Sequence, residues 1–81
     1  MRVTVCFFSY FKDLTGCAQT TETLAAGSTI GDLMKQLFVQ FPILSAMQNS
    51  TLIAVGVEYQ GRNYILNGGE EVSLFPPVQG G

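Results

Sequence analysis

The sequence contains no histidine. It therefore offers no Ser-His or Cys-His pair, no histidine ligand for zinc, and no side chain whose unperturbed pKa lies near neutrality to act as a general base. We expect no catalysis from the isolated chain, and we predict no metal site.

Charge is also scarce. Charged residues make up 12% of the chain, against about 25% in a typical soluble domain. The net charge is −2, and the few cations are scattered, whereas nucleic-acid phosphates call for clustered Lys and Arg, so no nucleic-acid partner is expected. Because 47% of the residues are hydrophobic, we expect some apolar surface to be covered by a partner protein. The cations are Arg2, Lys12, Lys35 and Arg62.

Cysteine is limited to Cys6 and Cys17, which lack any metal-ligand spacing. Such a pair fits reduced thiols and a cytoplasmic location better than a disulfide framework. Residues 36–57 carry no charge, but Pro42 and the polar run at 48–51 interrupt them, so no membrane span or membrane partner is expected.

Alternation of apolar and polar residues predicts the first and last strands. In residues 2–8 every second residue is apolar and forms the core face, which leaves Phe8 on the opposite face. In residues 70–75, Phe75 shares its face with Ser73, so its ring is expected to be exposed or half-exposed.

One main helix is predicted between these strands. Thr29 and Asp32 are close to a capping box, so the helix should begin at Ile30, and apolar residues recur at helical spacing until Pro42 ends it. Together the elements predict an α+β domain, a small mixed sheet with this helix packed on one face. The remaining predictions are a helical turn at 11–14 closed by Gly16, a second hairpin strand at 18–24, one short turn within 42–51, a central strand at 52–58 of unsettled parity, a turn at 59–62, a short strand at 63–66 and a glycine turn at 67–69.

The C-terminal residues indicate an arm. Pro76 and Pro77 lack the backbone N–H that a sheet ladder needs, so the last strand must end at Phe75. We expect a domain at 1–75 and an extended arm at 76–81. Two terminal glycines make the tip of that arm thin enough for a narrow channel, although a merely frayed terminus is the simpler alternative.

The tail Leu74–Gly81, LFPPVQGG, resembles the C-terminal signature of molybdopterin synthase small subunits, which are MoaD/ThiS-type sulfur carriers with a ubiquitin-like β-grasp fold. Gly56 stands where the family usually has asparagine, so the resemblance does not predict the local turn there. Further similar segments are Val3–Phe8, Phe11–Gly16, Thr29–Leu33 and Asn67–Val72.

The resemblance implies a carrier mechanism. A C-terminal carboxylate has a pKa near 3.5 and is a poor electrophile at neutral pH, so it must be activated. In the family a ubiquitin-activating-like adenylyltransferase uses ATP to adenylate the terminal glycine, here Gly81, and a persulfide then displaces AMP to leave a thiocarboxylate. The arm, with Gly80 next to its end, enters the large subunit of the heterotetrameric synthase and gives sulfur to a pterin precursor. ATP belongs to the partner, and this chain is expected to bind no cofactor.

The resemblance also agrees with a partner-binding surface at the exposed aromatic residues, continued by the arm. The alternative is that loops 9–17 or 42–51 bury the outer face of the sheet. The partner-binding residues predicted in this way are Phe8, Tyr59, Phe75, Pro76, Pro77, Val78 and Gln79.

Other functions remain open at this point. A thiazole-type sulfur carrier shares the fold and Gly-Gly but usually lacks the double proline. A ubiquitin-like protein modifier would use the same activated terminus to form isopeptide bonds with lysines. A purely structural adaptor would not need the tail.

Overall fold

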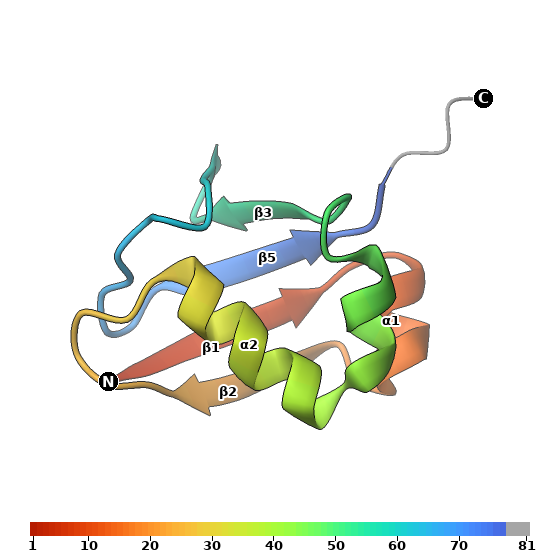
Figure 1. The fold of residues 1–81 in the computed structure, drawn as a ribbon, viewed down its shortest axis with the longest axis horizontal. Helices are drawn as coiled ribbons and strands as arrows, with labels where there is room; N and C mark the ends of the chain where they lie inside the picture. The colour runs from red at the N-terminus through yellow and green to blue at the C-terminus, as the bar shows by residue number, and fades with distance from the viewer. Residues whose placement is uncertain (78–81) are drawn as a thin grey trace.

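The structure is a computed structural model in which residues 1–77 are described. Within them a mixed five-stranded sheet has the order β2-β1-β5-β3-β4, and helix α2 crosses one of its faces (Figure 1). This is the predicted α+β arrangement. The strands are β1 (Arg2–Phe7), β2 (Gln19–Thr23), β3 (Leu52–Val55), β4 (Glu58–Tyr59) and β5 (Glu71–Phe75); the helices are α1 (Tyr10–Thr15), α2 (Ile30–Gln40) and the 3₁₀ helix η1 (Pro42–Met47).

Strand β5 is the centre of the sheet. It runs parallel to β1 and antiparallel to β3. Its inward residues Val72 and Leu74 are fully buried, and the inward residues of β1 and β3 lie beside them in register. The two core rows across the sheet are Val5, Val72, Val55 and Phe7, Leu74, Ile53.

Helix α2 covers this core face. Its start is fixed by the predicted capping box: the Asp32 N–H donates to Thr29 Oγ1 at 3.2 Å, and the Thr29 N–H donates to Asp32 Oδ2 at 2.9 Å. The Thr29 hydroxyl also donates to Asp32 Oδ2, at 3.2 Å, and the hydrogen bonds from the Thr29 backbone N–H and then from its hydroxyl lower the pKa of Asp32. The helix ends just before Pro42, as expected. Its buried side chains are Ile30, Leu33, Met34 and Leu37.

The other early elements also form as predicted. β2 pairs antiparallel with β1, and α1 includes the predicted turn and ends at Gly16, whose φ of 77° suits glycine. The 42–51 segment contains η1, which is longer than the single turn expected.

The prediction of one central strand at 52–58 was wrong. The chain reverses after Val55, where Gly56 has a φ of 61°, and returns as the short edge strand β4. Tyr59 therefore belongs to a strand and not to the predicted turn. The unsettled parity is resolved as well: Ile53 and Val55 point into the core, and Leu52 lies on the opposite face.

The predicted strand at 63–66 was also wrong, since only Ile65 forms a bridge, to Thr29. The backbone here serves α2 instead. The N–H groups of Ile30 and Gly31 donate to the carbonyls of Tyr64 and Arg62, both at 3.0 Å. The first N–H groups of a helix have no partner within it, so this segment satisfies them from outside. In the following turn, Gly69 takes the expected positive φ.

The covered face includes one buried carboxylate. Glu22 of β2 is 3% exposed, and the side-chain amides of Gln36 and Gln40 on α2 donate to its Oε1, at 2.8 and 2.5 Å. Such bonds offset the cost of removing a charge from water. They also tie the last two turns of α2 to the β2 edge of the sheet.

No helix within residues 1–77 is both long enough and apolar enough to cross a membrane.

Candidate functional site

The face of the sheet opposite α2 carries four large side chains at the end where β5 stops. They are Phe8, Leu52, Tyr59 and Phe75, called the outer patch below. Phe8, Leu52 and Tyr59 are 42%, 41% and 70% exposed, and Phe75 is half-buried. Leu52 pairs with Phe75, and Phe8 follows the Phe7–Leu74 pair. Phe75, Leu52 and Tyr59 thus come from β5, β3 and β4, and Phe8 directly follows β1.

Phe75 contacts both other aromatic residues of the patch. Its ring stacks on Phe8 with centroids 4.7 Å apart and an interplanar angle of 16°. Tyr59 approaches the same ring edge-on, with centroids 6.5 Å apart. Aromatic pairs of these geometries contribute about 0.5–1.5 kcal/mol beyond burial. The patch is therefore arranged before any partner binds, which lowers the entropy cost of binding.

Small side chains lie next to the rings on this face. Cys6, Ser73 and Ala54 occupy one row across the sheet, followed by Tyr59 on β4. Burial, and secondly the negative charge of Glu71, raise the pKa of the Cys6 thiol. Because the thiolate is the reactive form, Cys6 is placed as a small packing residue.

A groove runs from the outer patch to the root of the arm. The groove is lined by Ser9, Tyr10, Leu52, Tyr59, Phe75, Pro76 and Pro77. Tyr10 is held in place by a hydrogen bond from its hydroxyl to Met47 Sδ at 3.5 Å. Pro76 is buried and Pro77 is half-buried, so the root of the arm packs on the domain. The chain leaves the sheet at Phe75, as the double proline predicts.

The structure brings five predicted site residues together at this end: Phe8, Tyr59, Phe75, Pro76 and Pro77. The loops at 9–17 and 42–51 leave the exposed members of the patch open. Four further predicted residues lie outside the described part of the chain: Val78, Gln79, Gly80 and Gly81.

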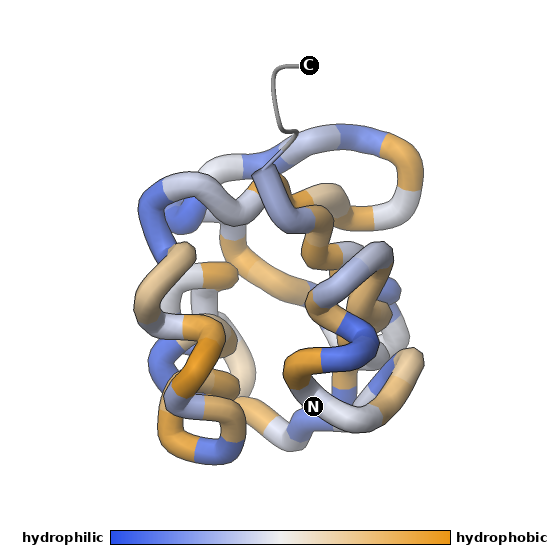
Figure 2. Tube along the Cα trace, turned by 90° about the vertical axis from the view of Figure 1, so that its right-hand side faces the viewer, coloured by the Kyte–Doolittle hydropathy of each residue, from blue (hydrophilic) through white to orange (hydrophobic). Residues whose placement is uncertain are grey.

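Sequence reasoning missed Leu52, Ser9 and Tyr10. Leu52 could have been found only by settling the parity of its strand, and the walls at Ser9 and Tyr10 depend on where α1 packs. Hydrophobic segments occur throughout the chain trace (Figure 2), so composition alone does not mark this face. Among residues 1–77 no cluster of three or more His, Cys, Asp or Glu side chains could hold a metal ion.

Two curated proteins are similar to the chain over its whole length. A molybdopterin synthase sulfur carrier subunit of Arabidopsis thaliana is 27% identical over 81 residues, which is 100% of this chain and 84% of that protein. A protein of the same name from Chlamydomonas reinhardtii is 29% identical and is matched over 100% of both chains.

Solved structures show the same fold. SAMP1 from Haloferax volcanii superposes with a TM-score of 0.89 at 21% identity over 100% of both chains. A putative molybdopterin converting factor subunit 1 from Pyrococcus furiosus gives 0.87 at 24% identity over 96% of this chain and 99% of that one. A chain in the complex of subunits 1 and 2 of molybdopterin-converting factor from Helicobacter pylori gives 0.70 at 23% identity over 100% of both. The predicted ubiquitin-like β-grasp fold is confirmed.

The sequence model of the ThiS family matches residues 5–81, which include all nine predicted site residues. Since this match covers nearly the whole chain, the protein belongs to the ThiS family.

Proposed function

We propose that this chain is the sulfur carrier of a molybdopterin synthase. The observation that carries the proposal is the end of β5. This central strand stops at Phe75 beside an exposed aromatic patch, and the sequence then continues through the double proline to the terminal Gly-Gly. The names of the two curated relatives support the same function. They favour the molybdopterin branch over a thiazole-type carrier, as does the double proline.

The proposed chemistry takes place on Gly81. An adenylyltransferase partner uses ATP: a carboxylate oxygen of Gly81 attacks the α-phosphorus, pyrophosphate leaves, and an acyl-adenylate forms. The terminal sulfur of a persulfide then attacks the carbonyl carbon, and AMP leaves. Cleavage of the S–S bond by a second thiol of the donor releases the thiocarboxylate, and the donor is left as a disulfide.

The described residues contribute binding and direction. In the proposal the outer patch docks the large synthase subunit, and the packed Pro76–Pro77 root aims residues 78–81 into its active site. Gly80 passes a constriction that a side chain would block. The general acids and bases belong to the partners, in keeping with a chain that has no histidine.

Intact-mass analysis of the protein purified from cells tests the proposal. We expect a species in which one oxygen is replaced by sulfur, and fragmentation should locate the change at Gly81. A chain lacking Gly81 is the control: it should lack this species and any sulfur transfer, yet melt like the wild type, because a terminal residue beyond the arm root contributes little burial. Gly80→Val should also fold normally and fail in activation or transfer.

Two results would contradict the proposal. Full sulfur transfer by the chain lacking Gly81 would remove the role of the terminus. Isopeptide conjugates to lysines in a cell lysate, with no thiocarboxylate, would select the protein-modifier function instead.

A further inference from the structure

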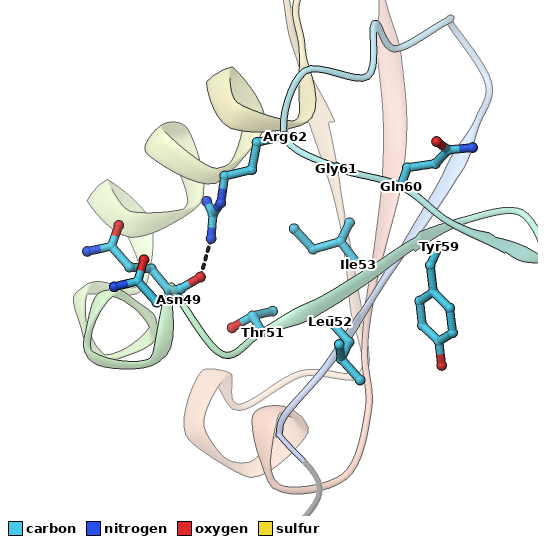
Figure 3. Close-up of a pocket in the computed structure, with 9 residues that line it drawn as sticks. Asn49, Thr51, Leu52, Ile53, Tyr59, Gln60, Gly61 and Arg62 are labelled. Atoms are coloured by element: carbon cyan, nitrogen blue, oxygen red, sulfur yellow. Dashed lines mark hydrogen bonds between the residues drawn. The ribbon is translucent and has the colours of Figure 1, made fainter.

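A second hollow, of about 460 Å³, lies beside the outer patch (Figure 3). It is bounded by the segment after η1, the start of β3, and the segment that follows β4. It shares Leu52 and Tyr59 with the outer patch, and Ile53 also lines it. Its polar side chains are Gln48, Asn49, Thr51, Gln60 and Arg62. An apolar surface therefore continues directly into a hydrogen-bonding one.

Arg62 gives this hollow its charge. Its carbonyl accepts the Gly31 N–H at 3.0 Å, which fixes its backbone against the start of α2. Its guanidinium reaches the segment after η1 and donates to the carbonyl oxygen of Gln48 (Figure 3). A guanidinium has five N–H donors, and a carbonyl is neutral, so this bond uses one donor and leaves the positive charge uncompensated.

The donors around the hollow match a carboxylate. A planar guanidinium binds the two oxygens of a carboxylate in parallel, and the amides of Asn49 and Gln60 on the same hollow can donate as well. The acidic side chains Glu58, Glu70 and Glu71 line another hollow, next to the turn between β3 and β4. Of the two hollows, only the one with Arg62 shares residues with the outer patch, so a protein that covers the patch meets the positive charge at its border.

We propose that Arg62 and its hollow receive an Asp or Glu side chain of the partner protein that docks on the outer patch. This rests on the proposed function, since the partner is the large synthase subunit. The apolar patch supplies the contact area, and the charge pair at its rim sets the orientation in which the arm points into the partner.

The test compares Arg62→Gln with Arg62→Lys in binding to the large subunit from the same organism, measured by calorimetry at low and high salt. Both variants lose the guanidinium bond to Gln48, but only Lys keeps the charge. At about 50 mM salt we expect the Gln variant to bind about fivefold more weakly than the Lys variant, and at about 500 mM the two should converge, because salt screens exposed charges. Lys35→Gln, which removes an exposed cation on α2, is the matched control and should bind like the wild type.

The outcomes separate this inference from the proposed function. If wild type binds but the Gln and Lys variants at position 62 are equal at low salt, or the control loses as much, the carboxylate site is wrong and the proposed function stands. If wild type does not bind the large subunit at all, the proposed partner is wrong and this inference falls with it.

Discussion

The two faces of the sheet carry similar apolar side chains and differ in what covers them. On the inner face Val72 and Leu74 are fully buried beneath α2. On the outer face of the same strand, Phe75 is half-buried, and its neighbours Phe8 and Leu52 are about two-fifths exposed. Apolar burial stabilises the monomer only where the chain itself provides the cover. The inner face therefore holds the fold, and the outer face leaves apolar surface exposed, which we propose is covered by a partner.

The largest loss of stability is expected from a substitution on the inner face. Leu74→Ala should lower the free energy of unfolding by about 3–4 kcal/mol, because it leaves a cavity in a fully buried row. Urea denaturation measures this loss. The matched control is Leu52→Ala, the same substitution on the outer face, which should cost less than about 1 kcal/mol. Equal losses for the two variants would show that the faces are not distinct.

Phe75→Ala tests the outer face. We expect complex formation with the large subunit to weaken by about 2 kcal/mol or more. The isolated domain should lose about 1–2 kcal/mol, mainly the stack with Phe8 and part of the ring's burial. Calorimetric titration and a melting curve measure the two effects. Val57→Ala, at a residue 99% exposed on the hairpin tip, is the control; a Phe75 variant that melts far below it, by the 3–5 kcal/mol typical of a core Phe, would make Phe75 a core residue.

A smaller loss of stability is expected at the start of α2, the helix that covers the inner face. Thr29→Ala removes the side-chain cap of α2 and should cost about 1 kcal/mol. Thr29→Ser keeps the hydroxyl and should behave nearly as wild type in the same thermal melts. At temperatures at which the Ala variant is folded, its affinity for the partner should equal that of the wild type, because Thr29 lies outside the outer patch. Weakened binding would show that the helix cap affects the outer face.

The smallest effect is a pH dependence of the same cap. The pKa of Asp32 is lowered in the folded state by the Thr29 donors. Its contribution is therefore fully present above the unfolded pKa of about 3.9 and is lost as pH falls through the lower folded value. Stability curves of wild type and Asp32→Asn should run parallel from neutral pH down to about pH 5 and converge below pH 4. A difference that persists unchanged at pH 2 would exclude the carboxylate as its source.

The errors of sequence interpretation lie together in residues 52–66. In the sequence, Gly56 is compatible with a strand position that has no side chain. Only its positive φ in the structure shows that the chain turns back there. Residues 63–66 look β-rich, but the backbone carbonyls of Arg62 and Tyr64 are taken by the start of α2, more than thirty residues earlier in the chain. Local β-propensity does not reflect hydrogen bonds to residues so far away in the sequence.

The sequence by itself determined the features that depend on neighbouring residues. Alternation in β1 and β5 placed Phe8 and Phe75 on the outer face, the Thr29–Asp32 spacing started α2, and the double proline ended β5 at Phe75. Only the tertiary structure decided that β5 is central, that Leu52 joins the outer patch, and that Arg62 lines a hollow beside it. The physical reason is that strand order and register are fixed by contacts between distant segments. Helix caps, proline stops and the parity of strands that alternate clearly, such as β1 and β5, are fixed within a few residues, whereas the continuous apolar run of β3 does not reveal its parity.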